Sequence, residues 1–510
     1  MQIRHVTLTH KKDSRVLLKD FSLVLHTDDK IVLIGEEGNG KSTLLKWMAD
    51  PSLTEDYIEA EGERILSGET VGYLPQELET ADRDRSVYAY LSETEQFLYQ
   101  SPAELASLAA TLGIRQELFY SDQTMGSLSG GERVKIQMAG LLMKHPDIFL
   151  LDEPSNDIDI ETLEWMEAWM LDTRQPILYI SHDETLIERT ANRVVLLEQL
   201  RRKTLSHHQI ANIPYRQFAS ERSDAFAKQE QLARSERREE KKALERFQRI
   251  EQRVEHEQAT ISRQDPHGGR LLKKKMAAVK ALERRYDREH EEMTEMPETE
   301  APIFILFDQA KAMPAGKRVL LFDLPQLTAA DGRILAGNIH LELYGPKKVC
   351  ILGRNGCGKT TLLRRIYEAL KNREDLKLCY MPQNYEDLLE MDQTPIDYLA
   401  PSGRKEDVTM VRTYLGSMKY TADEMSHPIA ELSGGQKAKV LLLKMSISEA
   451  DVLLLDEPTR NFSPLSGPVI REILRSFPGA IIAVSHDRKF IEEVTEVRYR
   501  LDAAGLQMVR

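Results

Sequence analysis

Two glycine-rich loops have the residue types and spacing that bind a chain of phosphates. They read Gly35-Glu-Glu-Gly38-Asn-Gly40-Lys41-Ser42-Thr43 and Gly353-Arg-Asn-Gly356-Cys-Gly358-Lys359-Thr360-Thr361. Glycine lets successive backbone N–H groups approach an anion closely, and the lysine adds a positive charge. The hydroxyls of Ser42 and Thr360 are suitable ligands for Mg²⁺. Each loop therefore predicts a site for nucleotide phosphates and a metal ion.

Matched polar residues that could cleave a phosphate bond follow each loop. They are Gln76, Asp152, Glu153 and His182 in the N-terminal half, and Gln383, Asp456, Glu457 and His486 in the C-terminal half. We expect each aspartate to hold Mg²⁺ through its water shell and each glutamate to act as general base on the attacking water. The glutamines would contact Mg²⁺ or that water, and the histidines would reach the γ-phosphate.

A Leu-Ser-Gly-Gly motif also occurs once in each half. Its residues are Ser129, Gly130 and Gly131 in the first copy, and Ser433, Gly434 and Gly435 in the second. The motif opens a helix, whose N-terminus binds anions. The serine, the glutamate of Asp-Glu and the histidine of Ser-His-Asp all recur 304 positions later. One motif could arise by chance, but an ordered set at a fixed offset predicts a tandem ATPase whose halves can face each other.

Short apolar runs precede the polar residues and indicate how they are positioned. Ile31–Ile34 and Val349–Leu352 lead into the loops, and Asp147–Leu151 and Val452–Leu455 lead into the Asp-Glu pairs. Such runs alternate with helical stretches. This pattern is typical of a mostly parallel sheet with helices on both faces, so the predicted fold class is α/β.

The segment between the halves has a different composition, dominated by Glu, Lys, Arg, Gln and Ala from about residue 216 to 296. Apolar residues recur there in two sets at steps of three and four, and Pro266, Gly268 and Gly269 interrupt them. We interpret the segment as two long helices folded back as an antiparallel hairpin. The sets are Leu244, Phe247, Ile250 and Val254, then Leu272, Met276, Val279, Leu282 and Tyr286.

Charge is concentrated at the far end of this hairpin. The whole chain has 510 residues and a net charge of −13, whereas Arg263–Arg288 holds nine basic and three acidic residues. A basic tip suits the phosphates of RNA. The alternative is a solvated spacer, which fits the near-balanced charge of the first helix. The chain shows no apolar run long enough for a bilayer, and its three cysteines lack metal-ligand spacing, so we expect a reducing, cytoplasmic location.

Together these motifs resemble the ATP-binding cassette superfamily. The resemblance implies two P-loop ATP-binding cassette domains in tandem, at 1–213 and 302–510, joined by a long antiparallel α-helical hairpin linker at 214–301. In that family, the Leu-Ser-Gly-Gly motif of one cassette covers ATP held by the other. Lys41 and Glu153 would then work with Ser433, and Lys359 and Glu457 with Ser129. ATP would join the halves, and hydrolysis would release them.

Two fused cassettes, no membrane segment and a helical hairpin resemble the ABC-F class more closely. Its members bind the ribosome, their linker reaches toward the peptidyl-transferase centre beside P-site tRNA, and some protect the ribosome from antibiotics. The N-terminal half lacks the added arm of the housekeeping factors, which resembles the resistance branch. The resemblance implies a monomeric cytoplasmic ATPase that uses ATP and Mg²⁺ on ribosomal RNA and tRNA. Two alternatives remain open: the ATP-binding subunit of a membrane transporter, and a DNA-structure-binding ATPase.

The two halves also depart from the family pattern. The segment after Glu153 ends in Asp159, whereas the corresponding segment after Glu457 has Ser463 instead. This difference argues against symmetric coupling of the two sites. The aromatic residue that usually stacks on adenine is missing, with His10 near its place in the first half and Ala329-Ala330 in the second. Base selectivity could then be loose, which leaves GTP open as a substrate.

Overall fold

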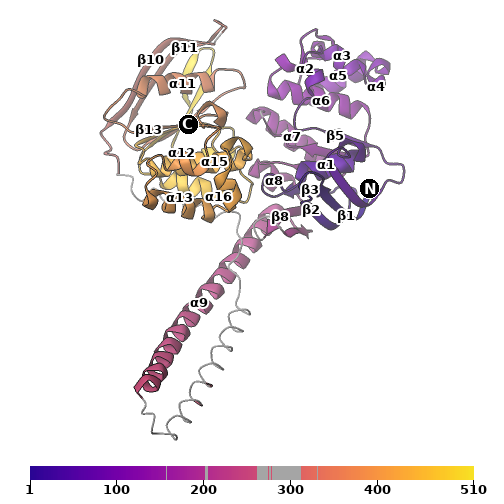
Figure 1. Ribbon diagram of the computed structural model, residues 1–510. Helices are drawn as coiled ribbons and strands as arrows, with labels where there is room; N and C mark the ends of the chain where they lie inside the picture. Colours follow the sequence, from indigo (N-terminus) through magenta and orange to yellow (C-terminus); the bar gives the residue numbers. More distant parts are fainter. Residues whose placement is uncertain are drawn as a thin grey trace. The chain divides into compact units, whose positions relative to one another are not determined.

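A computed structural model describes residues 1–156, 158–200, 205–260, 274, 277, 312–329 and 331–509. The chain divides into two compact units. One unit combines Met1–Arg216 with Glu300–Arg510, and the other is Gln217–Thr299. The first unit contains both nucleotide motif sets, and its elements are labelled in Figure 1.

The N-terminal half is built on a mixed sheet that is parallel except at one edge. Its strands lie in the order β5-β6-β7-β3-β8-β9, and only β8 and β9 pair antiparallel. The central strands β3 and β6 are buried along their whole length, as expected for parallel strands covered on both faces. The strands are β3 (Lys30–Ile34), β5 (Val71–Leu74), β6 (Ile148–Asp152), β7 (Ile177–Ile180), β8 (Arg193–Leu200) and β9 (Leu205–Ala211).

A smaller antiparallel sheet and a set of helices complete this half. The small sheet has the order β2-β1-β4, and the short helices α2 to α5 cluster beside α6 (Figure 1). The strands are β1 (Gln2–His10), β2 (Val16–Val24) and β4 (Ile58–Ile65). The helices are α1 (Lys41–Ala49), α2 (Thr80–Arg83), α3 (Val87–Ser92), α4 (Glu95–Tyr99), α5 (Pro102–Leu112), α6 (Gly130–Met143), α7 (Ile160–Asp172) and α8 (Glu184–Thr190).

The C-terminal half repeats the main sheet with the equivalent order β13-β14-β15-β12-β16-β17. Here too the edge pair β16 and β17 is antiparallel, and β14 and β15 are buried throughout. A separate two-stranded sheet is formed by β10 (Arg318–Thr328) and β11 (Ile334–Tyr344). The main strands are β12 (Lys348–Leu352), β13 (Leu378–Met381), β14 (Val452–Asp456), β15 (Ala480–Val484), β16 (Val497–Asp502) and β17 (Gly505–Val509). The α/β prediction is confirmed in both halves.

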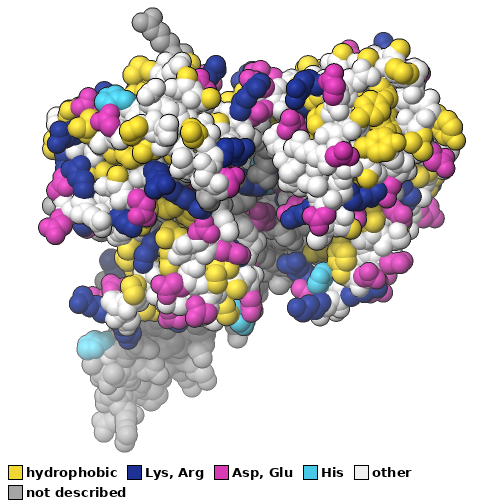
Figure 2. Space-filling model, turned by 90° about the horizontal axis from the view of Figure 1, so that it is seen from above, with side chains coloured by type: hydrophobic (Ala, Val, Ile, Leu, Met, Phe, Trp, Pro, Cys, Tyr) yellow, Lys and Arg dark blue, Asp and Glu magenta, His cyan; other side chains and the backbone are white. Residues whose placement is uncertain are grey.

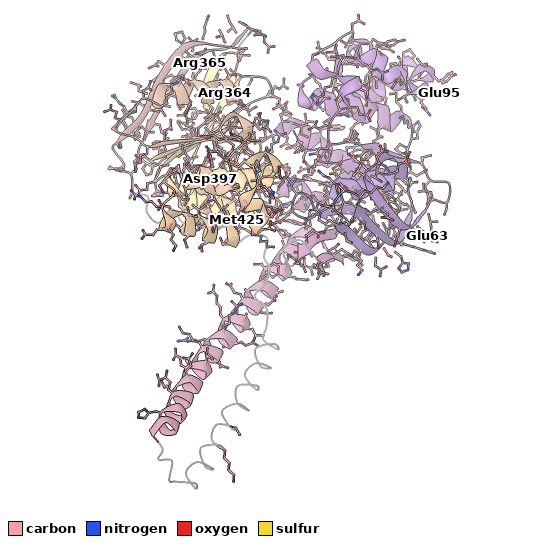
Figure 3. All side chains as sticks on the ribbon, viewed as in Figure 1. Glu63, Glu95, Arg364, Arg365, Asp397 and Met425 are labelled. Atoms are coloured by element: carbon pink, nitrogen blue, oxygen red, sulfur yellow. The ribbon has the colours of Figure 1, made fainter. Side chains whose placement is uncertain are left out.

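The helices of the C-terminal half follow the same plan. A small helical part contains α12 to α14, where Asp397 and Met425 are labelled in Figure 3. Met425 packs against the core of this part, which centres on residues such as Leu415 and Leu442. The helices are α11 (Lys359–Leu370), α12 (Pro395–Leu399), α13 (Lys405–Ser417), α14 (Ala422–Ser426), α15 (Gly434–Ile447), α16 (Gly467–Ser476) and α17 (Arg488–Val494).

One long helix, α9 (Tyr215–Thr260), follows the N-terminal half and is 46 residues long. It corresponds to the first arm of the expected hairpin. The predicted break at Pro266–Gly269 and the second arm lie outside the described residues, apart from Lys274 and Ala277. Most of the basic segment Arg263–Arg288 therefore also lies outside them.

Basic and acidic side chains are interspersed on the face shown in Figure 2. The excess negative charge is thus spread among cations there and does not form one broad field of a single sign on that face.

Candidate nucleotide sites

The first phosphate loop connects β3 to α1 and has the backbone geometry that an anion cradle requires. A Cβ atom at Gly35 would lie 2.2 Å from the backbone oxygen of Leu197, so a larger residue does not fit there. Gly40 caps α1 in the left-handed region at φ 85°. Lys41 Nζ donates to the carbonyls of Gly35 at 2.8 Å and Glu36 at 2.9 Å, which fixes the ammonium group at the loop.

The second loop repeats this geometry between β12 and α11. Gly358 caps α11 at φ 102°. Lys359 Nζ donates to the carbonyls of Gly353 at 2.7 Å and Arg354 at 3.0 Å. The hydroxyl residues predicted to contact phosphate or metal occupy the first turn of each helix. They are Ser42 and Thr43 in α1, and Thr360 and Thr361 in α11, while Gly38 and Gly356 share a φ of 77°.

Asp152 ends β6 and faces the first loop. Its Oδ1 accepts a hydrogen bond from Ser42 Oγ at 2.9 Å, and its Oδ2 accepts one from the Tyr73 hydroxyl at 3.3 Å. Burial raises the pKa of Asp152 to about 6, although the bond from Ser42 acts against this shift. The structure thus brings together Ser42 and Asp152, two of the three predicted metal ligands of the first site, whereas the third, Gln76, contacts Glu153.

Asp456 ends β14 at the equivalent place in the C-terminal half. Among the described residues, neither carboxylate oxygen of Asp456 has a hydrogen-bond partner, although both are buried. An orphaned buried carboxylate beside a phosphate loop fits a cation site. The described part of the chain contains no cluster of three His, Cys, Asp or Glu side chains able to hold a metal.

Glu153 is the centre of a hydrogen-bonded group in the N-terminal half. Its Oε1 lies 3.1 Å from His182 Nε2, and its Oε2 accepts bonds from Gln76 Nε2 at 3.1 Å and from the Asn156 amide. Burial disfavours the charged carboxylate, but the contacts with His182 outweigh burial and lower the pKa of Glu153 to about 2. The three predicted catalytic side chains of this half therefore lie together, around an ionised glutamate.

Glu457 has a different environment, although its backbone φ of 51° matches the 49° of Glu153. Its Oε2 accepts a hydrogen bond from the backbone N–H of His486 at 3.2 Å, and its Oε1 lies 3.8 Å from His486 Nε2. Burial raises the pKa of Glu457 to about 8 and lowers the pKa of His486 to about 4. The two general-base candidates thus share a backbone position but differ in protonation.

The Leu-Ser-Gly-Gly serines cap long helices, as predicted for an anion-binding terminus. Ser129 Oγ accepts the N–H of Glu132 at the start of α6, and Ser433 Oγ accepts the N–H of Gln436 at the start of α15. Both helices have a capping box and contain 14 residues. Gly130 and Gly131 lie in the first turn of α6, and Gly434 and Gly435 lie in that of α15.

A cavity of about 580 Å³ joins the second phosphate loop to the N-terminal half. Its lining includes Lys359 and Glu457 from the C-terminal half, and Gly130 of the first Leu-Ser-Gly-Gly motif. Its size lies within the range of small-molecule sites. Other predicted residues that line it are Gly356, Gly358, Thr360, Thr361, Gln383, Asp456, His182 and His486. Ala329 also lines the cavity, while Ala330 lies outside the described residues.

A smaller pocket, of about 40 Å³, joins the first phosphate loop to the second Leu-Ser-Gly-Gly motif. Glu36 and Glu37 of the loop line it together with Ser433 and Gly435. Glu37 Oε2 accepts a hydrogen bond from the backbone N–H of Gly435 at 2.7 Å. Sequence reasoning missed Glu37 as a functional candidate, although Asn355 at the matching position of the second loop could have marked it.

The segments after the catalytic glutamates also differ between the halves. Asp159 caps α7 by accepting the N–H of Thr162 at 3.0 Å. In the C-terminal half Ser463 occupies the position of that aspartate, and α16 begins only at Gly467, where Ser466 caps without a side-chain hydrogen bond. His182 Nδ1 lies 2.7 Å from the backbone oxygen of Phe462 in this second segment. This contact could not be predicted from the sequence, because it involves only a backbone oxygen of a distant residue.

Known proteins resemble this chain over nearly its whole length. The ABC transporter family matches residues 18–156 and 336–460, once in each half. Probable ATP-binding protein YheS of Escherichia coli strain K12 is 25% identical over 97% of this chain and 77% of its own. ABC transporter F family member 2 of Arabidopsis thaliana is 24% identical over 99% of this chain and 77% of its own. ATP-binding protein Uup of Escherichia coli strain K12 is 26% identical over 94% of this chain and 77% of its own.

Solved structures share the tandem fold at low identity. The archaeal ribosome recycling factor aABCE1, crystallised with ribosomal stalk protein aP1, has a TM-score of 0.59 and 15% identity, covering 99% of this chain and 90% of that one. RNase-L Inhibitor has a TM-score of 0.56 and 16% identity, covering 98% of this chain and 89% of that one.

Two phosphate loops on matched sheets, each followed by an Asp-Glu pair and a histidine, define a tandem P-loop ATP hydrolase. The chain belongs to the ABC transporter family, in the F class of tandem cassette proteins. The family resemblance inferred from the motifs is thereby confirmed. Within the described residues, every helix is too short or too polar to span a membrane.

Proposed function

We propose that this protein is a monomeric cytoplasmic ATPase that acts on the ribosome and binds ATP at two composite sites between its halves. The cavity that joins Lys359 and Glu457 to Gly130 is the observation that carries this proposal. A nucleotide in it would touch both halves and hold them together. In the other composite site, which contains the first phosphate loop, Lys41 and Glu153 would act with Ser433.

The proposed roles follow from position and protonation. The loop N–H groups and both lysines bind the nucleotide phosphates, and the Leu-Ser-Gly-Gly termini bind them from the other half. Glu153 is ionised in this structure, so it can accept a proton from the attacking water. Gln76 donates to Glu153 and His182 contacts it, so both hold that base in place. We propose the same roles for Glu457, Gln383 and His486 in the second site, where Glu457 must first lose the proton that it retains at neutral pH, because burial raises its pKa to about 8.

We propose Mg²⁺ as the metal at both sites. Ser42 and Asp152 would hold it at the first site, and Thr360 and Asp456 at the second, with Gln76 and Gln383 near its water shell. A bound Mg²⁺ neutralises charge on the β- and γ-phosphate oxygens. The orphaned oxygens of Asp456 and the bond from Ser42 to Asp152 support this choice of ligands.

Two observations support the ribosome as partner. The fold neighbours include a structure titled as a model of ribosome-bound archaeal Pelota and ABCE1, with a TM-score of 0.57 at 14% identity. The segment Arg263–Arg288 carries nine basic residues against three acidic ones. We propose that the linker at 214–301 contacts ribosomal RNA and P-site tRNA through this segment.

Replacing both general bases tests the ribosome assignment. Glu153→Gln with Glu457→Gln should leave ATP bound but uncleaved, because phosphate and metal ligands remain. Cosedimentation with ribosomes in the presence of ATP should then rise above that of the wild type. The exposed Glu63 of β4, labelled in Figure 3, offers a control, since Glu63→Gln makes the same chemical change outside both motif sets. A double variant that stays in the supernatant at low salt would contradict the assignment.

Reversing charge in the linker tests the RNA contact separately. Replacing Lys273, Lys274 and Lys275 by Glu should weaken binding to ribosomal RNA and reduce its salt dependence, while basal ATPase activity remains. Gel shifts with branched DNA as competitor distinguish RNA from DNA as the preferred partner. Stronger binding to branched DNA, or recovery of a stoichiometric membrane protein on affinity purification, would favour one of the alternatives.

We also propose that the protein protects ribosomes from an antibiotic. Only a short helical segment, α2 to α5, separates Gln76 from α6, which leaves no room for a large added arm. Expression in sensitive cells should raise the inhibitory concentration of a ribosome-targeting drug only when Glu153 and Glu457 are intact. Unchanged susceptibility across such drugs would favour a general role in translation.

A further inference from the structure

A buried group of charged side chains joins the two halves at helices α7, α8, α16 and α17. Glu184 Oε2 of α8 lies 2.8 Å from Arg471 Nη1 of α16. Glu167 Oε1 of α7 lies 2.6 Å from Arg488 Nη2 of α17. In both ion pairs, the N-terminal half supplies the acid and the C-terminal half supplies the base.

These residues occupy matched positions in the internal repeat. Arg471 lies 304 positions after Glu167, and Arg488 lies 304 positions after Glu184, which is the offset of the catalytic motifs. A third matched pair, Arg189 and Glu493, is also reversed in sign. All three positions therefore carry opposite charges in the two halves.

The contacts within each half follow the same two-fold scheme. Arg189 Nη1 donates to Glu167 Oε2 at 2.8 Å in the N-terminal half. Arg471 Nε donates to Glu493 Oε2 at 2.7 Å in the C-terminal half. Glu167 and Arg471 thus each hydrogen-bond one partner in their own half and form an ion pair with one residue of the other half. The scheme is the same in both halves, and the charges at these three matched positions are inverted.

Because these charges are buried, each requires an oppositely charged partner. The exposed fraction is 3% for Arg471, 5% for Glu167 and 8% for Glu184. A charge removed from water is strongly destabilising unless an opposite charge meets it. Burial alone would lower the pKa of Arg471, but Glu184 and Glu493 raise it, so the guanidinium is charged and compensated. Water cannot replace a missing partner at such a position.

Neighbouring residues extend the polarity. Lys489 Nζ donates to Glu184 Oε1 at 3.0 Å and also binds Glu188, both in α8. Arg488 Nη2 donates to Asp183 Oδ1 at 3.0 Å. Asp183 caps α8 and directly follows His182 of the first site. In the contacts between the halves, the cations come from α16 and α17, and the anions come from α7, α8 and the N-cap of α8.

We infer that this inverted charge pattern is a recognition surface that pairs each half only with the opposite half. Two N-terminal halves would bring Glu167 against Glu184, and two C-terminal halves would bring Arg471 against Arg488. Buried like charges repel and leave no compensating partner, so both pairings between identical halves of two chains are rejected. The partner that fits this surface on one half is the other half of the same chain.

Charge reversal in one half at a time tests this inference. Glu167→Arg with Glu184→Arg gives a chain whose two halves are both basic here. Arg471→Glu with Arg488→Glu gives one whose two halves are both acidic. The first chain keeps a native C-terminal half, and the second chain keeps a native N-terminal half. In a mixture of the two chains, these native halves can pair with each other through an unchanged junction. Sedimentation analysis should show at least tenfold more dimer in the mixture than in either variant alone. Equal amounts of dimer in all three samples, including none, would overturn the inference.

A milder pair of variants keeps the test decisive if charge reversal prevents folding. Arg471→Gln with Arg488→Gln should increase amide hydrogen exchange in α8, which contains neither substitution. Arg364→Gln with Arg365→Gln is the matched control, because both arginines lie in α11 (Figure 3) and the charge change is the same. Unchanged exchange in α8, or equal effects of both pairs, would contradict the inference.

Discussion

The Glu37 carboxylate of one half accepts a 2.7 Å hydrogen bond from the backbone N–H of Gly435 in the other half. That N–H belongs to the first turn of α15, where helix geometry favours anions. Lys439 of the same helix lies 3.5 Å from Glu36, the neighbour of Glu37. An acidic phosphate loop thus engages the helix terminus that we propose for nucleotide binding. The second loop has Arg354 and Asn355 at the corresponding positions.

We predict that Glu37→Asn strengthens ATP binding at the first site. The substitution removes a carboxylate that competes with phosphate for the Gly435 N–H and repels the nucleotide. A charge-assisted hydrogen bond contributes about 1.5–3 kcal/mol, so affinity should increase roughly tenfold or more. Titration with a fluorescent ATP analogue, in a Lys359→Ala background that disables the second loop, measures the effect. Asn355→Glu in a Lys41→Ala background is the converse variant and should weaken binding.

We predict opposite stability effects for the two general-base substitutions. The folded-state pKa of Glu457 is about 8, against an ordinary value of 4.5. Above pH 4.5 the unfolded chain loses this proton while the folded chain keeps it, so the contribution to stability falls until about pH 8. Glu457→Gln should therefore raise the melting temperature relative to wild type, and more at pH 8 than at pH 5.

The pKa of Glu153 is lowered to about 2, so its contribution to stability changes with pH in the opposite direction from that of Glu457. Its contribution is present above pH 4.5 and is lost as the pH falls toward 2. Glu153→Gln should therefore lower the melting temperature at pH 7, by about 2–4 °C for a loss of 1 kcal/mol. Calorimetry of the nucleotide-free proteins across this pH range measures both variants. If both variants changed the melting temperature in the same direction at pH 8, the two glutamates would not differ in protonation as described.

We predict that Asp159→Ala destabilises the N-terminal half by about 1 kcal/mol, through loss of the cap of α7. The Asp159 carboxylate accepts the N–H of Thr162 there. Ser466→Ala is the matched control, because Ser466 caps α16 without a side-chain hydrogen bond. Urea unfolding with a probe in each half measures both effects. A cost for Ser466→Ala equal to that for Asp159→Ala would contradict the comparison.

We predict that the second phosphate loop is insensitive to mild oxidation. Burial raises the pKa of the Cys357 thiol, and thiolate is the reactive form. Alkylation by iodoacetamide at neutral pH should be much slower at Cys357 than in the denatured chain, as mass spectrometry of the labelled peptide would reveal. Loss of ATPase activity at the rate of denatured-chain labelling would indicate a reactive thiol in the loop.

The matched motifs predicted much of the fold and much of the chemistry. A phosphate loop must lie between a buried strand and a helix, and β3 with α1 and β12 with α11 take those places. The Asp-Glu pairs had to follow buried strands, as Asp152 and Asp456 do. These features depend on local sequence, because glycine conformation, helix capping and apolar runs act over a few residues. The pairing of each loop with the opposite Leu-Ser-Gly-Gly motif remains a proposal.

Only the tertiary structure revealed how the two sites differ and how the halves recognise each other. The protonation of Glu153 and Glu457 depends on burial and on neighbours distant in sequence. The opposite charges of Glu167 and Arg471 can act in pairing only because the fold places each residue against an oppositely charged residue of the other half. The sequence by itself determined which chemical groups the protein carries and which strands and helices hold them. Folding decided which of those groups meet, because desolvation and Coulomb energy depend on separation in space and not along the chain.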